Sequence, residues 1–350
     1  MVKKIINILF IVSFFAYLAG CVTLTGPAVS QEEIKKTQEE LKVKALDYQI
    51  KQLQRLQNIG HRLMLAIPKE DINQPPQPLL GIMCFNVDEH LQKLYNLNMD
   101  KAVVVVVVKE PSPASEVGIK PGDVLLSINN TKINNLHQFA NVVDNLKIGD
   151  RLQIKVLRDQ QYLSFETKIA SIPVNLPIII VDLQEVNAAT DGRAIFVTYG
   201  LLNFAKSDDE IAAVLAHELA HAVRRHVTKA QGTQILSFLA ALALGIAVES
   251  NAPGSGEAVM RGVNQIGEIF NAHYSRDLER EADYFGTRFV YYAGYDVEAC
   301  ATVEERFAIE IPASMVKNFL STHPSSPERV TRIRKTIEEL KAKELKERKE

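Results

Sequence analysis

The chain has 350 residues, of which 47% are hydrophobic and 23% are charged, and its formal net charge is −2 at pH 7. This length is sufficient to bury at least one full core. Because phosphate binding needs clustered Lys and Arg, the near-neutral balance argues against nucleic acid as a partner.

The N-terminus has the pattern of an export signal. Lys3 and Lys4 precede an apolar run from Ile5 to Leu18. That run is too short to span a bilayer comfortably, and a basic start followed by such a run is typical of a signal segment. An uncleaved anchor helix and an ordinary signal peptide share these features and stay open as alternatives.

The sequence LAGC, which ends at Cys21, resembles a bacterial lipoprotein lipobox. The resemblance implies that residues 1–20 are a lipoprotein signal peptide and that lipid attached to Cys21 tethers the protein to a membrane surface. Val22 follows the cysteine, and the sorting rule of enteric-type bacteria then favours the outer membrane. The expected location is the periplasmic face of the bacterial cell envelope.

The other two cysteines are Cys84 and Cys300. They could pair in an oxidising periplasm, but they fall in different predicted domains. We therefore expect two separate buried thiols.

Residues 31–67 are charged and have helical periodicity. The apolar stripe of this segment consists of Leu46, Ile50, Leu53, Leu56, Ile59, Leu63 and Ile67. A helix with one such stripe must pack it against another element. The sequence NQPPQP at residues 73–78 forbids a helix and marks a boundary.

From residue 75 to residue 171 the pattern changes to short strands and a helix. Six consecutive valines, Val103 to Val108, predict a strand that is buried on both faces. Residues 135–146 have a helical pattern, and residues 151–159 and 162–169 predict a closing pair of strands.

This segment resembles a PDZ domain of the kind found with bacterial proteases, on the sequences LLGI at 79–82 and SPASEVGIKPGDVLLSINNTKI at 112–133. The resemblance implies that Leu79, Leu80, Gly81 and Ile82 form a loop whose N–H groups bind a peptide's terminal carboxylate while the peptide adds a strand to the sheet edge. In the alternative, the domain only packs on its neighbour.

The sequence SDDEIAAVLAHELAHAVRRH predicts a helix with a capping box, in which Ser207 precedes Glu210 by three residues. His217 and His221 are four residues apart and share one face, which suits two imidazoles on one zinc ion. Glu218 can accept a proton from water that the metal activates. His226 is off that face near the predicted helix end, where we expect it to interact with the helix dipole rather than the metal.

A catalytic zinc site wants a third protein ligand. In SRDLEREADYFG, residues 275–286, and the residues that follow it, helical geometry predicts a buried stripe of Leu278, Ala282, Phe285 and Phe289. Glu279 and Asp283 share one flank with Gly286, which leaves room for another helix, and acids on that flank need a cation. Glu279 as a ligand, with Asp283 orienting a histidine ring, fits this need; in the alternative, all these acids only solvate a surface helix. The other two acids, Asp277 and Glu281, are expected to be solvated.

Together, HELAH and SRDLEREAD resemble metallopeptidase family forty-eight, which includes the heat-shock membrane protease and the CAAX prenyl protease. Its periplasmic lipoprotein-like branch is the more similar one. The family motif E-x-x-A-D falls on Glu279, Ala282 and Asp283, which implies that Glu279 is the third zinc ligand.

The resemblance extends to two further segments. VNAATDG at 186–192 puts Asn187 in the place of an active-site Asn, although the family's Pro-Gly-Gly turn is absent. STHPSSPERV at 321–330 implies that His323 lies near the zinc, where it would stabilise the oxyanion or reversibly occupy the open zinc position.

The family's catalytic domain starts with a helix like residues 31–66 and continues with a strand near Val181, so the PDZ module is predicted to be an insertion. The predicted parts are the signal peptide 1–20, an N-terminal helical segment 21–74, the PDZ domain 75–171 and the metallopeptidase domain 172–350 with its charged C-terminal helix. The predicted fold class is α+β, a mainly helical zincin-type domain with a small edge sheet, interrupted by a partly open β-barrel. Residues 235–248 are strongly apolar; their length favours a buried or surface-apposed helix over a membrane-dipping hairpin.

The sequence thus predicts a zinc endopeptidase with one Zn²⁺ per chain that cleaves misfolded or unassembled envelope proteins, with the PDZ recruiting or gating substrate. The alternative is a lipid-anchored chaperone or assembly factor that acts through its PDZ and has a latent zinc site. The enzyme is favoured because a scaffold has no need for Glu218 or for an acid pair at this spacing. The sequence leaves the oligomeric state open.

Overall fold

The computed structural model describes residues 27, 29–72, 74–99, 101–227, 269–270, 274–311, 323 and 326–348. The predictions for residues 1–20, Cys21 and residues 235–248 lie outside these ranges. Within them, no helix combines the length and the hydropathy that a membrane span needs. The chain divides into two compact units, residues 1–45 and residues 46–350.

The predicted N-terminal helix is α2 (Gln31–Ala66). Ser30 and Glu33 close its first turn reciprocally, because Glu33 N–H donates to Ser30 Oγ at 3.2 Å and Ser30 N–H donates to Glu33 Oε2 at 2.7 Å. Within the second unit, the predicted apolar stripe is buried from Ile50 to Ile67. The helix thus packs that stripe into a core, as its periodicity predicts.

The predicted PDZ segment, residues 75–171, contains a six-stranded sheet. Its strand order is β2-β3-β4-β6-β7, and β5 pairs with β4. Its strands are β2 (Ile82–Asn86), β3 (Val103–Val108), β4 (Val124–Ile128), β5 (Thr131–Lys132), β6 (Arg151–Arg158) and β7 (Gln161–Lys168), and its helices are α3 (Glu89–Tyr95), α4 (Pro113–Glu116) and α5 (Leu136–Val143). A separate antiparallel pair, β1 (Gln77–Leu79) and β8 (Ala170–Ile172), joins the start and the end of the segment. The predicted partly open barrel stays a prediction, because the pairing in these ranges gives an open sheet.

The valine strand β3 is buried along its whole length, as predicted. Val103 and Val105 belong to the core inside the sheet segment. Val104 and Val106 belong instead to the main core, which also contains the stripe of α2. The strand therefore has two buried faces because it separates two hydrophobic cores.

One face of α2 also binds the backbone at the end of β3. The side-chain amide of Gln54 donates to Val108 O at 2.8 Å and accepts from Val108 N–H at 2.9 Å. One turn later Asn58 accepts from Glu110 N–H at 3.2 Å, and His61 Nε2 lies 2.7 Å from Pro111 O. Side chains at i, i+4 and i+7 thus hold the sheet segment to this helix.

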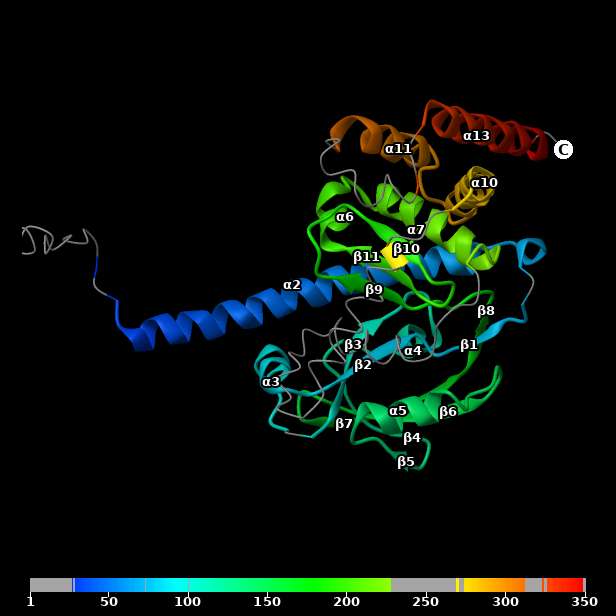
Figure 1. The fold of residues 1–350 in the computed structure, drawn as a ribbon. Coiled ribbons are helices and arrows are strands. Elements are labelled where there is room, and N and C mark those ends of the chain that lie inside the picture. The colour runs from blue at the N-terminus through cyan, green and yellow to red at the C-terminus, as the bar shows by residue number, and fades with distance from the viewer. Residues whose placement is uncertain are drawn as a thin grey trace, which may run out of the picture. The chain divides into compact units, whose positions relative to one another are not determined.

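The remaining elements surround a three-stranded sheet in the order β10-β11-β9, in which β11 is antiparallel to β10 and parallel to β9. The strands are β9 (Ile178–Val181), β10 (Ala188–Thr190) and β11 (Ile195–Thr198), followed by helices α6 (Tyr199–Phe204), α7 (Asp208–Val223), α10 (Arg276–Tyr292), α11 (Ala299–Glu310) and α13 (Pro327–Glu347); a short 3-10 turn, η1 (Lys69–Asp71), follows α2. Figure 1 shows α7, α10, α11 and α13 gathered beside this sheet. The mixed helix and sheet class is as predicted, and β10 is an edge strand.

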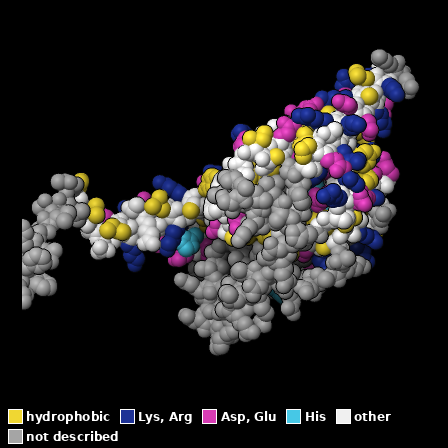
Figure 2. Space-filling view, turned by 45° about the horizontal axis from the view of Figure 1, so that its top comes forward, with side chains coloured by type: hydrophobic (Ala, Val, Ile, Leu, Met, Phe, Trp, Pro, Cys, Tyr) yellow, Lys and Arg dark blue, Asp and Glu magenta, His cyan; other side chains and the backbone are white. Residues whose placement is uncertain are grey.

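The charged C-terminal run stays helical to Glu347. Arg334 pairs with Glu305 at 2.5 Å and Lys341 pairs with Glu298 at 2.5 Å, both between exposed groups. Figure 2 shows acidic and basic side chains intermingled over the coloured part of the visible face. Such exposed pairs contribute about 0 to 1 kcal/mol each, so the burial of Ile333, Ile337 and Leu340 holds α13 more strongly than they do.

Candidate metal centre

Helix α7 carries the first three residues of the site. Ser207 caps it by accepting a hydrogen bond from Glu210 N–H at 3.2 Å. The Glu210 carboxylate accepts from Lys206 N–H at 2.7 Å and from Arg306 at 2.5 Å, so the cap is also held by α11. His217, Glu218 and His221 are all buried in this helix.

Helix α10 faces α7 with the side that carries the acids. Its buried residues include Glu279, Asp283 and Gly286, whereas Leu278 and Phe285 of the predicted buried stripe are only half-buried. The predicted stripe is therefore wrong at these two positions. The physical reason is Gly286, where an added Cβ would lie 3.1 Å from His217 Cα, so the glycine lets α10 approach α7 along the acidic flank.

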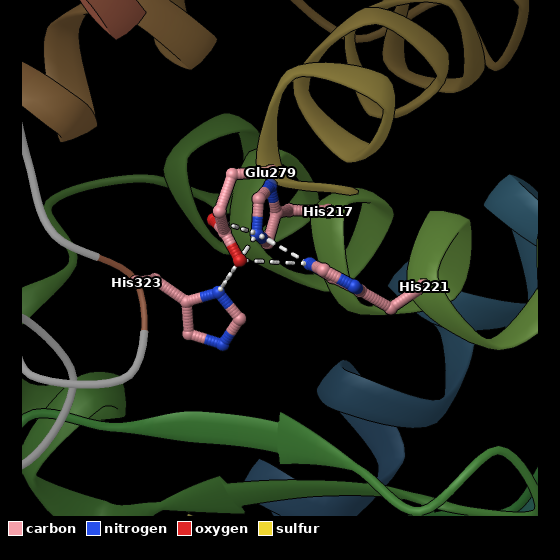
Figure 3. Close-up of side chains that lie close together, drawn as sticks. All are labelled: His217, His221, Glu279 and His323. Atoms are coloured by element: carbon pink, nitrogen blue, oxygen red, sulfur yellow. Dashed lines mark hydrogen bonds and ion pairs between the residues drawn. The ribbon is translucent and has the colours of Figure 1, made fainter. Parts of the chain in front are cut away.

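Four buried residues converge where these helices meet: His217, His221, Glu279 and His323. One ligand atom from each lies within 4.8 Å of the others. Figure 3 shows two imidazoles from α7, the carboxylate from α10 and the His323 ring from the segment before α13 pointing toward one another. Glu279 Oε1 is 3.4 Å from His221 Nε2 and 2.8 Å from His323 Nδ1, and Glu279 Oε2 is 3.4 Å from His217 Nε2.

The donor set fits a zinc ion. Imidazole nitrogen and carboxylate oxygen are both common zinc ligands. Burial alone would raise the pKa of Glu279, but bonds from three histidines hold it far below its ordinary value, so the carboxylate is ionised. Burial lowers the pKa of His221 well below 6.5, which leaves that ring neutral. These are the protonation states that metal binding requires.

His217 differs from His221 in this respect. Burial lowers its pKa, but the hydrogen bonds that its ring donates to Asp283 and Glu279 outweigh burial and raise the pKa to about 10. A metal at this site would therefore displace a proton from His217.

Glu218 lies between the two α7 histidines in sequence and is 0% exposed. Neither of its carboxylate oxygens has a hydrogen-bond partner within the described ranges, although His323 Nε2 lies 3.5 Å from Oε1. Burial raises the pKa of Glu218 above 4.5, while the nearby His323 and His217 lower it. A carboxylate in this setting is suited to hold a proton transiently.

Asp283 makes the contact that its predicted role requires, with Oδ1 3.0 Å from His217 Nδ1. Arg329, at the start of α13, donates to both oxygens of Asp283 at 2.9 and 2.7 Å. It also donates to the His323 carbonyl at 3.1 Å. Sequence reasoning did not single out Arg329. A cation in the first turn of a helix opposes the helix dipole, and that unfavourable position was the available signal.

His226 lies just beyond the end of α7 and outside the four-residue cluster, as expected, whereas Glu281 is less exposed than expected. His226 Nδ1 lies 3.0 Å from His221 Nδ1, and Glu281 is hydrogen-bonded by both Arg224 and His226. Glu281 is half-buried rather than solvated because the end of α7 packs beside it. Asp277 is exposed and pairs with Arg280, as expected.

Tyr274 is a further residue that the sequence did not reveal. Its ring stacks on His221 with centroids 3.9 Å apart, and its hydroxyl lies 3.5 Å from Thr190 O of β10. It precedes the N-cap of α10, Ser275, and so links the edge strand to the histidine cluster.

The remaining predicted site residues are Asn187 and the four residues of the predicted peptide-binding loop. Asn187, which is 1% exposed, directly precedes β10, and neither atom of its side-chain amide has a partner within the ranges described. Leu79, Leu80, Gly81 and Ile82 connect β1 to β2 in the sheet segment and take no part in the histidine cluster. Gly81 has a φ of +92°, which favours glycine there. Cys84 and Cys300 are separate, free and buried, as expected.

A buried His-Glu-x-x-His helix with a glutamate from a second helix defines the metallopeptidase class. Residues 167–337 match the family model Peptidase family M48, and residues 78–169 match the PDZ domain. The chain therefore contains a region that matches the M48 peptidases and, before it, a region that matches PDZ domains.

Three relatives are each similar to somewhat less than half of this chain. Mitochondrial metalloendopeptidase OMA1 from Schizosaccharomyces pombe is 35% identical over 43% of this chain and 43% of its own length. Putative beta-barrel assembly-enhancing protease from Vibrio cholerae is 35% identical over 42% of this chain and 32% of its own length. Metalloprotease YcaL from Escherichia coli is 30% identical over 47% of this chain and 63% of its own length. The chain thus covers less than two thirds of each of them.

Proposed function

We propose that this protein is a zinc-dependent endopeptidase that hydrolyses polypeptides in the bacterial cell envelope. The observation that carries the proposal is Glu218, a buried carboxylate without a hydrogen-bond partner in the described ranges, held beside a cluster of metal-binding type. A buried carboxylate without hydrogen bonds is costly to a fold, so a position that keeps one favours a chemical role.

Three residues are proposed to hold the zinc: His217 and His221 through Nε2, and Glu279 through its carboxylate. When bound, zinc supplies Lewis-acid polarisation of the scissile carbonyl and lowers the pKa of water. Glu218 takes the proton of the attacking water and returns it to the leaving amine. Its buried setting raises its pKa, which favours the first transfer, in which the carboxylate takes up the proton.

His323 and Asn187 are proposed to act on the substrate side. His323 approaches both Glu279 and Glu218, at 2.8 and 3.5 Å, so it is near enough either to stabilise an oxyanion or to occupy the open zinc position reversibly. Asn187 would hydrogen-bond an extended substrate that lies along the edge strand β10, because its amide is otherwise without a partner in the described ranges.

Digestion of casein by the purified protein tests the catalytic assignment. Glu218→Gln should retain zinc and lose activity by about 10²- to 10⁴-fold, which is the usual contribution of a general base. Asp277→Asn is the matched control because Asp277 is exposed and pairs only with Arg280 among the ion pairs of its helix. Equal activity of Glu218→Gln and wild type would rule out the proposed mechanism.

Zinc content tests the ligand assignment. Glu279→Ala should lose most of the metal, and Asp277→Ala should keep it. If Glu279→Ala binds zinc as tightly as wild type, the third ligand is another residue.

The PDZ domain is proposed to recruit or gate substrates by binding a chain end. Strand β2 is at the edge of the sheet, and α5 lies beside it, with Leu136 N–H donating to Asn86 Oδ1 at 2.9 Å. None of the eight residues of α5 is fully buried, although the helix carries Leu136, Phe139 and Val142 on its packed side. An edge strand beside an apolar helix face suits an added peptide strand.

Peptide binding to the full chain tests this role. A peptide with a free terminal carboxylate should bind more tightly than its C-terminally amidated form if Leu79–Ile82 bind the carboxylate. Equal binding of the two forms would argue against this loop as the binding site.

The envelope location and the substrates are inferred from the N-terminal sequence and from the relatives. A relative named as a beta-barrel assembly-enhancing protease favours envelope proteins as substrates. Lipid on Cys21 would anchor the chain at the periplasmic face of a membrane. Because Val22 follows the cysteine, the sorting rule of enteric-type bacteria favours the outer membrane. Metabolic labelling with a fatty acid should mark wild type and leave Cys21→Ala unlabelled; label in both would exclude Cys21 as the site.

The second candidate function is a lipid-anchored chaperone or assembly factor whose PDZ does the work. It is favoured by the four-residue cluster, because a fourth donor, His323, leaves a metal without an open position. Absence of casein cleavage by wild type under several activating conditions, with retained peptide binding, would support this candidate.

A further inference from the structure

The last turn of α7 brings a second histidine against a proposed zinc ligand. His221 presents Nε2 to the cluster, 3.1 Å from His217 Nε2, and presents Nδ1 to His226 Nδ1 at 3.0 Å. His226 in turn places Nε2 3.2 Å from Glu281 Oε2, and the other oxygen of Glu281 accepts from Arg224 Nε at 2.7 Å. The contacts form one continuous chain from the cluster to the half-buried carboxylate of Glu281.

We propose that His226 and Glu281 are positioning residues for the metal centre, which fix the tautomer and the ring orientation of His221. This inference deepens the proposed function and rests on it. Neither residue touches the metal or the substrate; both act through His221.

The hydrogen positions along the chain have one consistent arrangement. A nitrogen that binds zinc must be bare, so the proton of His221 sits on Nδ1 and is donated to His226. His226 Nδ1 is then the acceptor, so its own proton sits on Nε2 and is donated to Glu281. A carboxylate at the end of the chain, held by Arg224, accepts that proton's hydrogen bond. Each group is satisfied once, and no alternative leaves His221 Nε2 free for metal while keeping both bonds.

The backbone is built to return His226 to this place. Helix α7 ends at Val223, and Arg225 adopts a left-handed φ of 58°. Arg225 N–H donates to Ala222 O at 3.2 Å and His226 N–H donates to His221 O at 3.0 Å, which is the Schellman arrangement. This turn folds the chain back so that residue 226 lies over residue 221.

The left-handed residue is an arginine, and not the glycine that such a turn favours. A non-glycine residue in this conformation costs about 1 kcal/mol. Contacts that offset this cost come from the same region: Arg224 bonds Glu281 and lies 4.3 Å above the Phe285 ring, and the His226 side chain is only 3% exposed. Because these contacts hold the turn in an unfavourable backbone conformation, His226 has a defined position against His221. The helix end is therefore not frayed at this point.

The two proposed histidine ligands are thus supported in parallel. His217 Nδ1 has a direct carboxylate partner, Asp283, whereas His221 Nδ1 reaches its carboxylate, Glu281, through His226. Metal-binding histidines almost always donate their second nitrogen to such a partner, and loss of the partner typically weakens metal binding.

Zinc affinity of the full chain, measured by competition with a chelator, tests the inference. His226→Ala should weaken zinc binding by about 10- to 100-fold, and Glu281→Gln should weaken it by a smaller factor, because these residues support rather than provide a ligand. His226→Gln, whose amide oxygen can accept from His221 Nδ1, should restore part of the affinity. Asp277→Asn on the same helix should have no effect.

The absorption spectrum of the cobalt-substituted protein gives a readout that a purely structural role would not change. His226→Ala should alter the spectrum because His221 turns relative to the metal. Wild-type zinc affinity and an unchanged cobalt spectrum in His226→Ala would overturn the inference, even if the variant unfolds at a lower temperature. If His226→Ala does not fold, Glu281→Gln carries the same two measurements, and its wild-type behaviour would overturn the inference.

Glu279→Ala separates this inference from the proposed metal site. If Glu279→Ala keeps its zinc, the proposed site itself is wrong. If it loses zinc while His226→Ala and Glu281→Gln keep wild-type affinity, only the positioning role is wrong.

Discussion

Arg329 holds Asp283 through two parallel hydrogen bonds, from Nε to Oδ2 at 2.9 Å and from Nη2 to Oδ1 at 2.7 Å. Both groups are buried, and Asp283 is the carboxylate that contacts His217. The same guanidinium donates to the carbonyl of His323 and pairs with Glu304 of α11 at 3.2 Å. One side chain from α13 therefore reaches three of the four residues in the cluster: His217 through Asp283, His323 through its carbonyl, and Glu279 at 3.7 Å.

Replacing Arg329 by Lys should weaken the metal centre although it keeps the charge. An ammonium cannot reproduce the bidentate geometry of a guanidinium, so Asp283 would lose one of its bonds and His217 its fixed orientation. We expect zinc affinity to fall by about 10- to 100-fold, as for other changes around metal ligands. Chelator competition measures the change.

Arg332→Lys is the matched control, since Arg332 is one turn later in α13 and bonds the exposed Glu328. It should leave zinc affinity unchanged. Equal zinc affinity of Arg329→Lys and wild type would show that Asp283 does not need the bidentate contact with Arg329 to support His217.

Local patterns in the sequence were sufficient to predict elements that are specified by their own neighbouring residues. The long apolar stripe of α2, the capping residue Ser207 and the valines of β3 each predicted an element that the structure contains. The Glu279 and Asp283 flank was separable for the same reason, because helical geometry fixes which side chains are neighbours.

Contacts that depend on tertiary packing were not accessible in this way. Nothing near Arg329 in sequence indicates Asp283, which is 46 residues away. The role of Glu281 depends on where α7 ends and on the left-handed conformation of Arg225. The sequence RRH at residues 224–226 does not predict such a turn. The two half-buried residues of the predicted stripe, Leu278 and Phe285, were misassigned because a close helix contact at Gly286 outweighed the apolar pattern.

Gly286→Ala should destabilise the contact between α7 and α10. The added Cβ would lie 3.1 Å from both Cα and N of His217 and 3.2 Å from the carbonyl carbon of Ala216, and backbone atoms cannot move aside independently. Overpacking of this kind costs about 1 to 3 kcal/mol, more than the ~1 kcal/mol that Ala gains over Gly in a helix. Chemical denaturation should show a lower free energy of unfolding and chelator competition a weaker zinc site.

Arg276→Ala, at the exposed start of the same helix, controls for a general effect of substitution in α10. It should change neither quantity by more than about 0.5 kcal/mol, as is usual for surface positions. A Gly286→Ala variant that is as stable as wild type and binds zinc normally would mean that the two helices can separate without cost.

Gln54→Leu should loosen the PDZ domain from the helix that carries it. Leucine keeps the size of the side chain but leaves both the N–H and the C=O of Val108 without the partner they have in the wild type. A buried polar group without a hydrogen bond costs about 1 to 3 kcal/mol. The C-terminal end of β3, at Val108, should therefore open more often. Hydrogen exchange should become faster over residues 105–111 and stay unchanged in α10. Lys51→Leu, one turn earlier and mostly exposed, should leave exchange in both regions as in wild type.

His61 should make the contact between α2 and the PDZ domain sensitive to acid. Its ring is 1% exposed, Nε2 bonds Pro111 O, and Nδ1 has no hydrogen-bond partner in the described part of the chain. Burial lowers the pKa of His61 below 6.5, and the charge of Lys109 lowers it further, although the bond to Pro111 raises it. The native state thus disfavours the protonated ring, and protonation would place a buried N–H beside no acceptor.

The sign of the resulting pH dependence follows from linkage. Because the folded pKa lies below the unfolded one, the unfolded chain binds more protons as the pH falls below about 6.5, so stability is highest above that pH and declines below it. His61→Gln, which keeps a donor for Pro111 O and does not titrate, should lose this part of the decline between pH 7.5 and about 5. Exposed His137→Gln should keep it. Denaturation curves across this range, with hydrogen exchange near Pro111, measure the effect; parallel pH curves for wild type and His61→Gln would show that the contact between α2 and the PDZ domain does not respond to this histidine.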